Sequence, residues 1–268
     1  MSDRQLTDGE LWAREELALL RAARWAPSAA VRFLLHSQQR ASAQRALRPA
    51  TAARIRAWTA TGAATWIALA AADVPPFRHR LREGATWWAA SAVMLDWHIG
   101  MLETVDGQPR NLGVADALTL VRAWLVPVVA DTPTAAIVLV AAATDVLDGA
   151  VARATAPTRA GRDLEGLVDA CFAAAALRGA TRRGLLPRGA ARLELARLGA
   201  GFAYSLVVYF GRADAPDPAV VRAARLSSPA RAGGLILAAL GRRRPGAVVL
   251  AGGSLWSIAA VAGALLRR

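Results

Sequence analysis

Four carboxylic acids in the middle of the chain are spaced so that they could share a metal ion. Asp145 and Asp148 lie three residues apart, directly after an uncharged run over residues 132–144. Glu165 and Asp169 lie four residues apart, further along the chain. Residues with these spacings project from one face of a helix. Each pair is therefore expected to present both of its carboxylates to the same side.

The connector between the two acid pairs is short and polar. It reads ATAPTRA over residues 154–160. A connector of this length makes the flanking helices antiparallel neighbours, so both acid pairs would lie at the same end. Four carboxylates held together repel one another, and a divalent cation bound through their oxygens relieves that repulsion. The spacing therefore predicts a metal site.

Two neighbouring residues indicate that the site also binds phosphate. Gly149 has no side chain and allows another group to approach the backbone closely. Arg153 offers a planar cationic group that suits phosphate. The helix dipole favours acids near a helix N-terminus, which is an alternative explanation for Asp163 and Glu165. It does not explain Asp145 and Asp148, since negative charge is disfavoured at a helix C-terminus.

The elements that must position these residues are long and apolar. The chain is 55% hydrophobic and 6% aromatic, with a mean hydropathy of +0.30, and its apolar residues come in blocks. Such blocks are typical of membrane-spanning helices, because only helices and closed barrels satisfy their backbone in lipid. The longest block, residues 246–266, contains no charge. Eight candidate spans are expected: residues 57–72, 85–102, 117–130, 132–152, one from about 161, 198–211, one ending near 240, and 246–266.

The predicted fold class is all-α, a polytopic membrane helical bundle. Residues 1–56 would form a basic cytosolic juxtamembrane segment, because residues 17–56 contain eight arginines and no acid. This segment is either a solvated basic arm or one that recognises anionic lipid. The first 16 residues carry five acids, so no cleavable signal peptide is expected.

The net charge of +13 does not indicate a nucleic-acid-binding protein. All 33 basic residues are arginines that flank apolar blocks throughout the chain, so no nucleic acid partner is expected. Cys171 is the single cysteine and cannot form an internal disulfide. A cation or proton transporter is the alternative function, since acids on neighbouring membrane helices also serve ion pathways. A non-catalytic scaffold would leave the four acids without a role.

These residues resemble the signature of the CDP-alcohol phosphotransferases, membrane enzymes of phospholipid synthesis. That signature is D-x-x-D-G-x-x-A-R, a spacer of seven or eight residues, then G-x-x-x-D-x-x-x-D, and seven of its eight fixed positions match between residues 145 and 169. Glu165 is the departure, because the family has Asp there. Upstream, Thr119 and Arg122 match the family's first core helix, while Asp116 stands where Asn is usual.

The resemblance implies six core helices over residues 111–268. The two apolar blocks before them predict two additional membrane helices over residues 57–110. The resemblance implies that one or two Mg²⁺ or Mn²⁺ ions are held by Asp145, Asp148, Glu165 and Asp169, with Asp169 also acting as general base. It implies a CDP-binding set and two arginines near the phosphate of the acceptor. These residues are, for CDP, Gly149, Ala152, Arg153, Thr119 and Gly161, and for the acceptor phosphate, Arg225 and Arg231.

The reaction implied is transfer of a phosphatidyl group from CDP-diacylglycerol to an alcohol, with release of CMP. Arginines bind phosphate well, so a phosphorylated acceptor such as glycerol phosphate or inositol phosphate fits better than a neutral alcohol. The resemblance also implies a homodimer in the cell membrane, surrounded by lipid, with its active site facing the cytosol. Glu165 leaves two possibilities open, an active enzyme or a degenerate family member.

Overall fold

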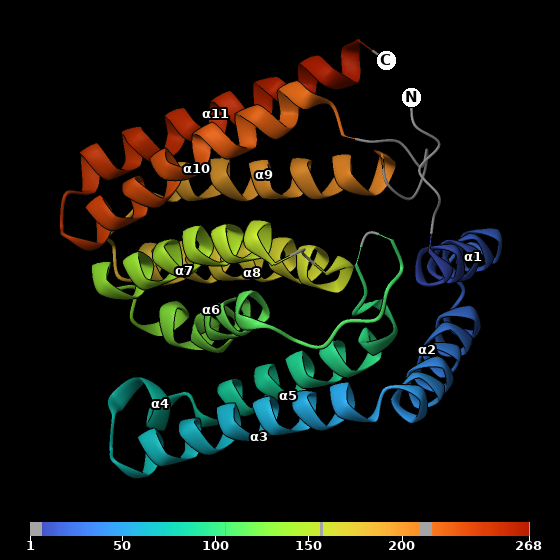
Figure 1. The fold of residues 1–268 in the computed structure, drawn as a ribbon. Coiled ribbons are helices and arrows are strands. Elements are labelled where there is room, and N and C mark those ends of the chain that lie inside the picture. Colours follow the sequence, from blue (N-terminus) through green and yellow to red (C-terminus); the bar gives the residue numbers. More distant parts are fainter. Residues whose placement is uncertain (1–6, 105, 156–157, 209–215, 268) are drawn as a thin grey trace. The chain divides into compact units, whose positions relative to one another are not determined.

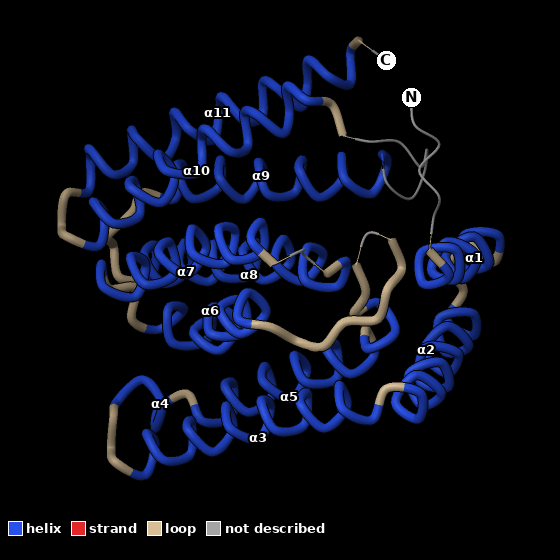
Figure 2. The backbone as a smooth tube through the Cα atoms, in the orientation of Figure 1, coloured by secondary structure: helices blue, strands red, loops and turns tan. Residues whose placement is uncertain are grey.

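The computed structural model describes residues 7–104, 106–155, 158–208 and 216–267, without the side chains of residues 152, 153, 162 and 163 (Figure 1). The structure is 85% helical and the described residues form no strand, which confirms the all-α prediction (Figure 2). An isolated antiparallel bridge joins Glu103 and Pro109. The helices are α1 (Asp8–Ala22), α2 (Pro27–Leu47), α3 (Pro49–Ala71), α4 (Pro75–His79), α5 (Leu81–Trp97), η1 (Ile99–Met101), α6 (Val114–Asp131), α7 (Ala135–Ala154), α8 (Arg159–Arg182), α9 (Arg188–Ser205), α10 (Pro218–Ala239) and α11 (Arg243–Leu266).

The chain divides into two compact units. The first contains residues 1–124 and 145–168, and the second contains residues 125–144 and 169–268. Helices α6, α7 and α8 each contribute one part to each unit. The predicted acids Asp145, Asp148 and Glu165 therefore belong to the first unit, and Asp169 belongs to the second.

The first unit is built on the packing of α3 against α5, which lie side by side (Figure 1). Its core joins buried apolar side chains of α3, α5, the segment after α5, and the first turn of α8. These are Ala52, Ile55, Leu95, Ile99, Leu102, Leu112 and Ala160. Trp66, Phe77 and Trp124 form an aromatic cluster with ring centroids 5.0–5.4 Å apart. This core fixes the start of α8, where part of the predicted site lies.

In the second unit, α10 and α11 pack against each other over most of their length, and α9 packs against α11 (Figure 1). The α10–α11 contact is close because glycines face it. A Cβ on Gly234 would lie 2.7 Å from the backbone nitrogen of Leu250, and a Cβ on Gly246 would lie 2.7 Å from the carbonyl oxygen of Gly234. Small residues at such contacts are typical of helix pairs in membranes.

Within the described residues, one helix is long and apolar enough by its own composition to cross a membrane. It is α11, with a mean hydropathy of 1.9 over its most apolar window. The apolar block at residues 57–72 lies in α3 up to Ala71, and α3 begins earlier, at Pro49. The block at residues 85–102 starts within α5, which begins at Leu81 and ends at Trp97, so the predicted span is divided between α5 and η1. The multi-pass arrangement, the six-helix core and the two additional membrane helices stay predictions.

Candidate metal centre

Three of the four predicted acids converge in the first unit. Asp145 and Asp148 lie in the second half of α7, and Glu165 lies in the second turn of α8. Each can offer a carboxylate oxygen such that the three atoms lie within 4.8 Å of one another. Asp148 is buried, while Asp145 and Glu165 are half-buried. This separation suits carboxylates that share one cation.

A buried arginine of α6 pairs with two of these three acids. The Nη1 of Arg122 lies 2.6 Å from the Oδ2 of Asp148, and its Nη2 lies 3.9 Å from the Oδ1 of Asp145. The side chains of Arg122 and Asp148 are 1% and 2% exposed. Three carboxylates outnumber the one guanidinium in this group, and such a set of oxygen ligands suits a divalent cation.

One carboxylate oxygen of Asp148 accepts no hydrogen bond from the described residues. Thr119 donates its hydroxyl hydrogen to the Oδ2 of Asp148 at 3.3 Å, on the same oxygen that faces Arg122. The Oδ1 of Asp148 is buried and accepts no hydrogen bond from any described group. A buried carboxylate oxygen without a donor is unfavourable, and a bound cation would satisfy it. The residues present therefore fit a divalent metal.

The first turn of α8 is closely packed around Gly161. The backbone N–H of Gly161 donates to the Oγ1 of Thr158 at 2.9 Å, and Thr158 donates to the Oδ1 of Asp116 at 3.4 Å. A Cβ on Gly161 would lie 2.7 Å from the Oγ1 of Thr158 and 2.9 Å from the Oδ1 of Asp116. Only glycine fits at this position without displacing its neighbours.

Asp116 stands at the start of α6, before the apolar stretch over residues 117–130. Burial raises the pKa of its carboxyl group, and hydrogen bonds from Gly113 and Thr158 act in the opposite direction. The Gly113 backbone N–H donates to its Oδ2 at 2.7 Å. Burial thus favours the uncharged acid, which resembles the Asn that the signature usually has here.

The remaining predicted CDP-binding residues lie on α7. Gly149 is half-buried and directly follows Asp148. Ala152 and Arg153 belong to the same helix, but their side chains lie outside the described part of the chain. Asp169 follows Glu165 by four residues in α8 and is described with the second unit. Its roles as ligand and base stay predictions.

The two predicted acceptor arginines lie on α10 in different surroundings. Arg225 is exposed. Arg231 lies 3.2 Å, through its Nη1, from the Oε1 of Glu194, and its Nη2 donates to the carbonyl of Ala224 at 3.3 Å. Six residues apart on a helix, the two side chains are rotated by about 120° from each other.

Glu194 is the centre of a buried polar network that the sequence reasoning missed. It is 2% exposed and accepts hydrogen bonds from Arg197 at 2.8 Å and Ser254 at 2.7 Å, besides its pair with Arg231. The local signal is the spacing of Glu194 and Arg197 by three residues, but Ser254 and Arg231 are distant in sequence. For Arg122 the sequence does indicate a functional role, because a charge lies inside an apolar stretch, but it does not indicate that Asp145 and Asp148 are its partners.

Comparison with protein-family models gives a match over residues 112–259, more than half of the 268-residue chain. The matching family is CDP-alcohol phosphatidyltransferase. No curated protein and no solved structure matches the chain. The matched range contains all four predicted acids and the arginines Arg122, Arg225 and Arg231.

Proposed function

The chain belongs to the CDP-alcohol phosphatidyltransferase family, and we propose that it is a metal-dependent enzyme that transfers a phosphatidyl group from CDP-diacylglycerol to an alcohol. The observation that carries this proposal is the cluster of Asp145, Asp148 and Glu165 around Arg122. Its charge, its burial and the open oxygen of Asp148 fit a Mg²⁺ or Mn²⁺ ion. The signature in which the cluster lies supports one or two such ions.

The reaction needs a base, a charge-neutralising group and a held nucleotide. The hydroxyl oxygen of the acceptor forms a bond to the phosphatidyl phosphorus, the bond from that phosphorus to CMP breaks, and Asp169 takes the hydroxyl proton. A divalent cation, when bound, neutralises the diphosphate and stabilises CMP as it leaves. Arg153 would pair with the diphosphate, and Gly149 would leave room for the cytidine. Gly161 would serve the CDP site by letting the first turn of α8 pack closely against Thr158 and Asp116.

Residues of α6 would keep the cluster in order. Arg122 and Thr119 both approach the Oδ2 of Asp148, which directs its Oδ1 away from them and toward the position of a cation. Ligands held by neighbouring hydrogen bonds and ion pairs bind metal better than free ones. Thr119 would therefore act on the site through Asp148, in addition to the CDP contact that the family resemblance implies.

Glu165 supports an active enzyme over a degenerate one. Its carboxylate reaches the cluster even though the family signature has Asp at this position. The additional methylene thus does not remove the charge from the site. We propose that Glu165 replaces the usual Asp as a metal ligand.

The acceptor is proposed to carry a phosphate, as glycerol phosphate and inositol phosphate do. Arg197 and Arg231 place two guanidinium groups beside the carboxylate of Glu194. Guanidinium groups bind phosphate well. Arg225, exposed on the same helix as Arg231, would add attraction for that group.

The lipid substrate supports a location in the cell membrane. We propose a multi-pass protein in contact with membrane lipids, with the metal centre at the cytosolic face and a homodimeric assembly as the family resemblance implies. The apolar composition of α11 supports at least one crossing.

The test is CMP release by the purified protein in detergent, from CDP-diacylglycerol with Mn²⁺ or Mg²⁺ and a panel of phosphorylated and neutral alcohols. Metal-dependent CMP formation with one acceptor, lost in Asp169→Asn, would support the proposal and identify the product. Cation flux into liposomes without cytidine nucleotide binding would contradict it and favour a transporter.

A further inference from the structure

A buried ion pair connects the first helix of the chain to the helix that carries Glu165. Arg159 is the first residue of α8, and its guanidinium pairs with the carboxylate of Glu10 in α1. Both side chains are 2% exposed. Glu10 lies about a hundred residues before the range that matches the family, so the family's own residues do not supply this partner.

The segment after α5 closes around the same arginine. The backbone N–H of Arg159 donates to the carbonyl of Glu103 at 2.9 Å, and its Nε–H donates to the carbonyl of Thr104 at 3.4 Å. The guanidinium of Arg110 donates to the carbonyl of Thr155, in the connector between α7 and α8. The connector between the two acid-bearing helices is thus held from both ends by residues outside α7 and α8.

Glu10 itself is fixed within α1. The backbone N–H of Thr7 donates to its Oε2 at 3.1 Å, so the carboxylate is held against the start of its own helix while it pairs with Arg159. Glu103, also buried, lies near Arg48 of α2. Burial lowers the pKa of the Arg48 guanidinium, and the nearby Glu103 carboxylate raises it.

The ion pair lies close to the proposed chemistry. Arg159 is directly followed by Ala160, which is completely buried in the core of the first unit, and then by Gly161, whose surroundings leave no room for a Cβ. Glu165 follows one turn later in the same helix. A shift at Arg159 would therefore move Gly161 and Glu165 together, because they belong to one rigid helix.

We infer that Glu10 is a positioning residue for the metal and nucleotide site, acting through Arg159 on the first turns of α8. This inference rests on the proposed function. A buried arginine deprived of its carboxylate partner is strongly unfavourable, and the structure would relax by displacing the start of α8. The N-terminal helix α1 is then a part of the enzyme's active structure and not only an appendage of the core.

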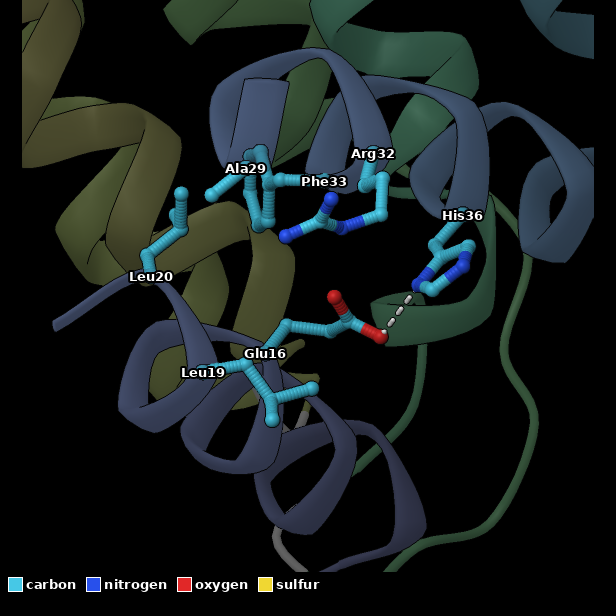
Figure 3. Close-up of a pocket in the computed structure, with 7 residues that line it drawn as sticks. All are labelled: Glu16, Leu19, Leu20, Ala29, Arg32, Phe33 and His36. Carbon is cyan, nitrogen blue, oxygen red and sulfur yellow. Dashed lines mark hydrogen bonds and ion pairs between the residues drawn. The ribbon is translucent and has the colours of Figure 1, made fainter. Parts of the chain in front are cut away.

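Glu16 provides a matched control on the same helix. Its carboxylate faces His36 of α2 across a small pocket, with an Oε1 to Nδ1 distance of 2.9 Å (Figure 3). Glu16→Gln therefore makes the same chemical change in α1 and removes the negative charge that faces His36 of α2, without touching α8.

The experiment measures Mn²⁺ binding to the full-length protein in detergent by electron paramagnetic resonance of free Mn²⁺, together with KM for CDP-diacylglycerol and kcat. Glu10→Gln is expected to weaken Mn²⁺ binding about tenfold, the lower end of what loss of a ligand-orienting group costs. KM is expected to rise by a similar factor, with a smaller change in kcat. Glu16→Gln is expected to have the Mn²⁺ binding, KM and kcat of the wild type. Recovery of Mn²⁺ binding and KM in the double variant Glu10→Arg with Arg159→Glu would support the inference.

Mn²⁺ affinity and KM unchanged in Glu10→Gln, or equally reduced in Glu16→Gln, would overturn the inference. If Glu10→Gln does not fold, Glu10→Asp replaces it, because aspartate keeps the negative charge but is one methylene shorter, which draws the carboxylate away from Arg159. Weaker Mn²⁺ binding in that variant supports the inference, and unchanged binding overturns it. A wild-type protein that binds Mn²⁺ but releases no CMP would contradict the proposed function, while the comparison of Mn²⁺ affinities would still decide the role of Glu10.

Discussion

At the scale of single residues, the metal centre depends on the balance between three carboxylates and Arg122. The guanidinium contacts the buried Asp148 and approaches Asp145, so it offsets their repulsion in the absence of metal. It leaves the Oδ1 of Asp148 without a donor among the described residues. Arg122 and a cation thus stabilise the same carboxylate through different oxygens.

Replacement of Arg122 by alanine is expected to destabilise the protein by about 3–5 kcal/mol, the usual cost of removing one partner of a buried ion pair. Added Mn²⁺ should raise the melting temperature of Arg122→Ala less than that of the wild type, because Asp148 is then no longer held in place for the cation. Thermal unfolding with and without Mn²⁺ measures both effects.

Arg78→Ala is the control for Arg122→Ala. Arg78 pairs with Asp73, and both side chains are more than 60% exposed. An exposed pair contributes little, about 0–1 kcal/mol. An equal loss of stability in the two variants would contradict a special role for Arg122.

Asp116→Asn is expected to retain transferase activity within about threefold and to be at least as stable as the wild type at neutral pH, because Asn can accept from Gly113 and donate to Thr158. Burial raises the pKa of Asp116, so the folded state binds its proton more tightly than the unfolded state does. Because of Asp116, the free energy of unfolding therefore decreases as the pH rises from the ordinary carboxyl pKa to the raised pKa of the folded state. Asparagine removes that dependence.

The prediction for Asp116 is checked by urea unfolding of wild type and Asp116→Asn across a pH series. Asp116→Ala, which cannot hydrogen bond, is expected to lose stability at every pH. If Asp116→Asn lost as much stability as Asp116→Ala, the negative charge itself would be required.

At the scale of elements, close helix contacts position the charged groups of the second unit. Gly234 and Gly246 bring the backbones of α10 and α11 together, and Ser254 of α11 reaches Glu194 of α9 at 2.7 Å. The pair between Glu194 and Arg231 thus depends on the approach of three helices.

Gly234→Ala is expected to destabilise the protein by about 1–3 kcal/mol, the typical cost of overpacking, because its Cβ would lie 2.7 Å from the backbone of Leu250. The adjacent Gly233→Ala is the matched control, since a Cβ there meets nothing within 4 Å. Alanine favours helix over glycine, so the control should be neutral or slightly stabilising. Equal unfolding midpoints for the two variants would contradict the observed α10–α11 contact.

At the scale of the whole molecule, local patterns were predictable from the sequence and long-range partners were not. The spacing of Asp145, Asp148 and Glu165 and the short connector sufficed to bring these acids together, because helix geometry and a tight connection are local properties. The partners of Arg122, Arg159 and Arg231 are distant in sequence, and a single sequence carries no signal for such pairs. Apolar blocks located the helices but not their starts, since Pro49 and Leu81 begin helices well before the blocks.

The apolar composition predicts that the full chain is an integral membrane protein. It is expected to stay in the membrane pellet after alkaline carbonate extraction, because hydrophobic burial in lipid does not depend on charge. Fractionation of expressing cells, followed by detection of the chain in pellet and supernatant, measures this. Release into the supernatant would indicate a peripheral attachment.

The most direct test of the central claim is Mn²⁺-dependent CMP release by the wild type beside Asp148→Asn and Glu165→Gln. We expect activity in the wild type that chelation abolishes, and a loss of at least about a hundredfold in each variant together with weaker Mn²⁺ binding. Variants that bind Mn²⁺ and release CMP as the wild type does would show that these carboxylates do not form the metal centre.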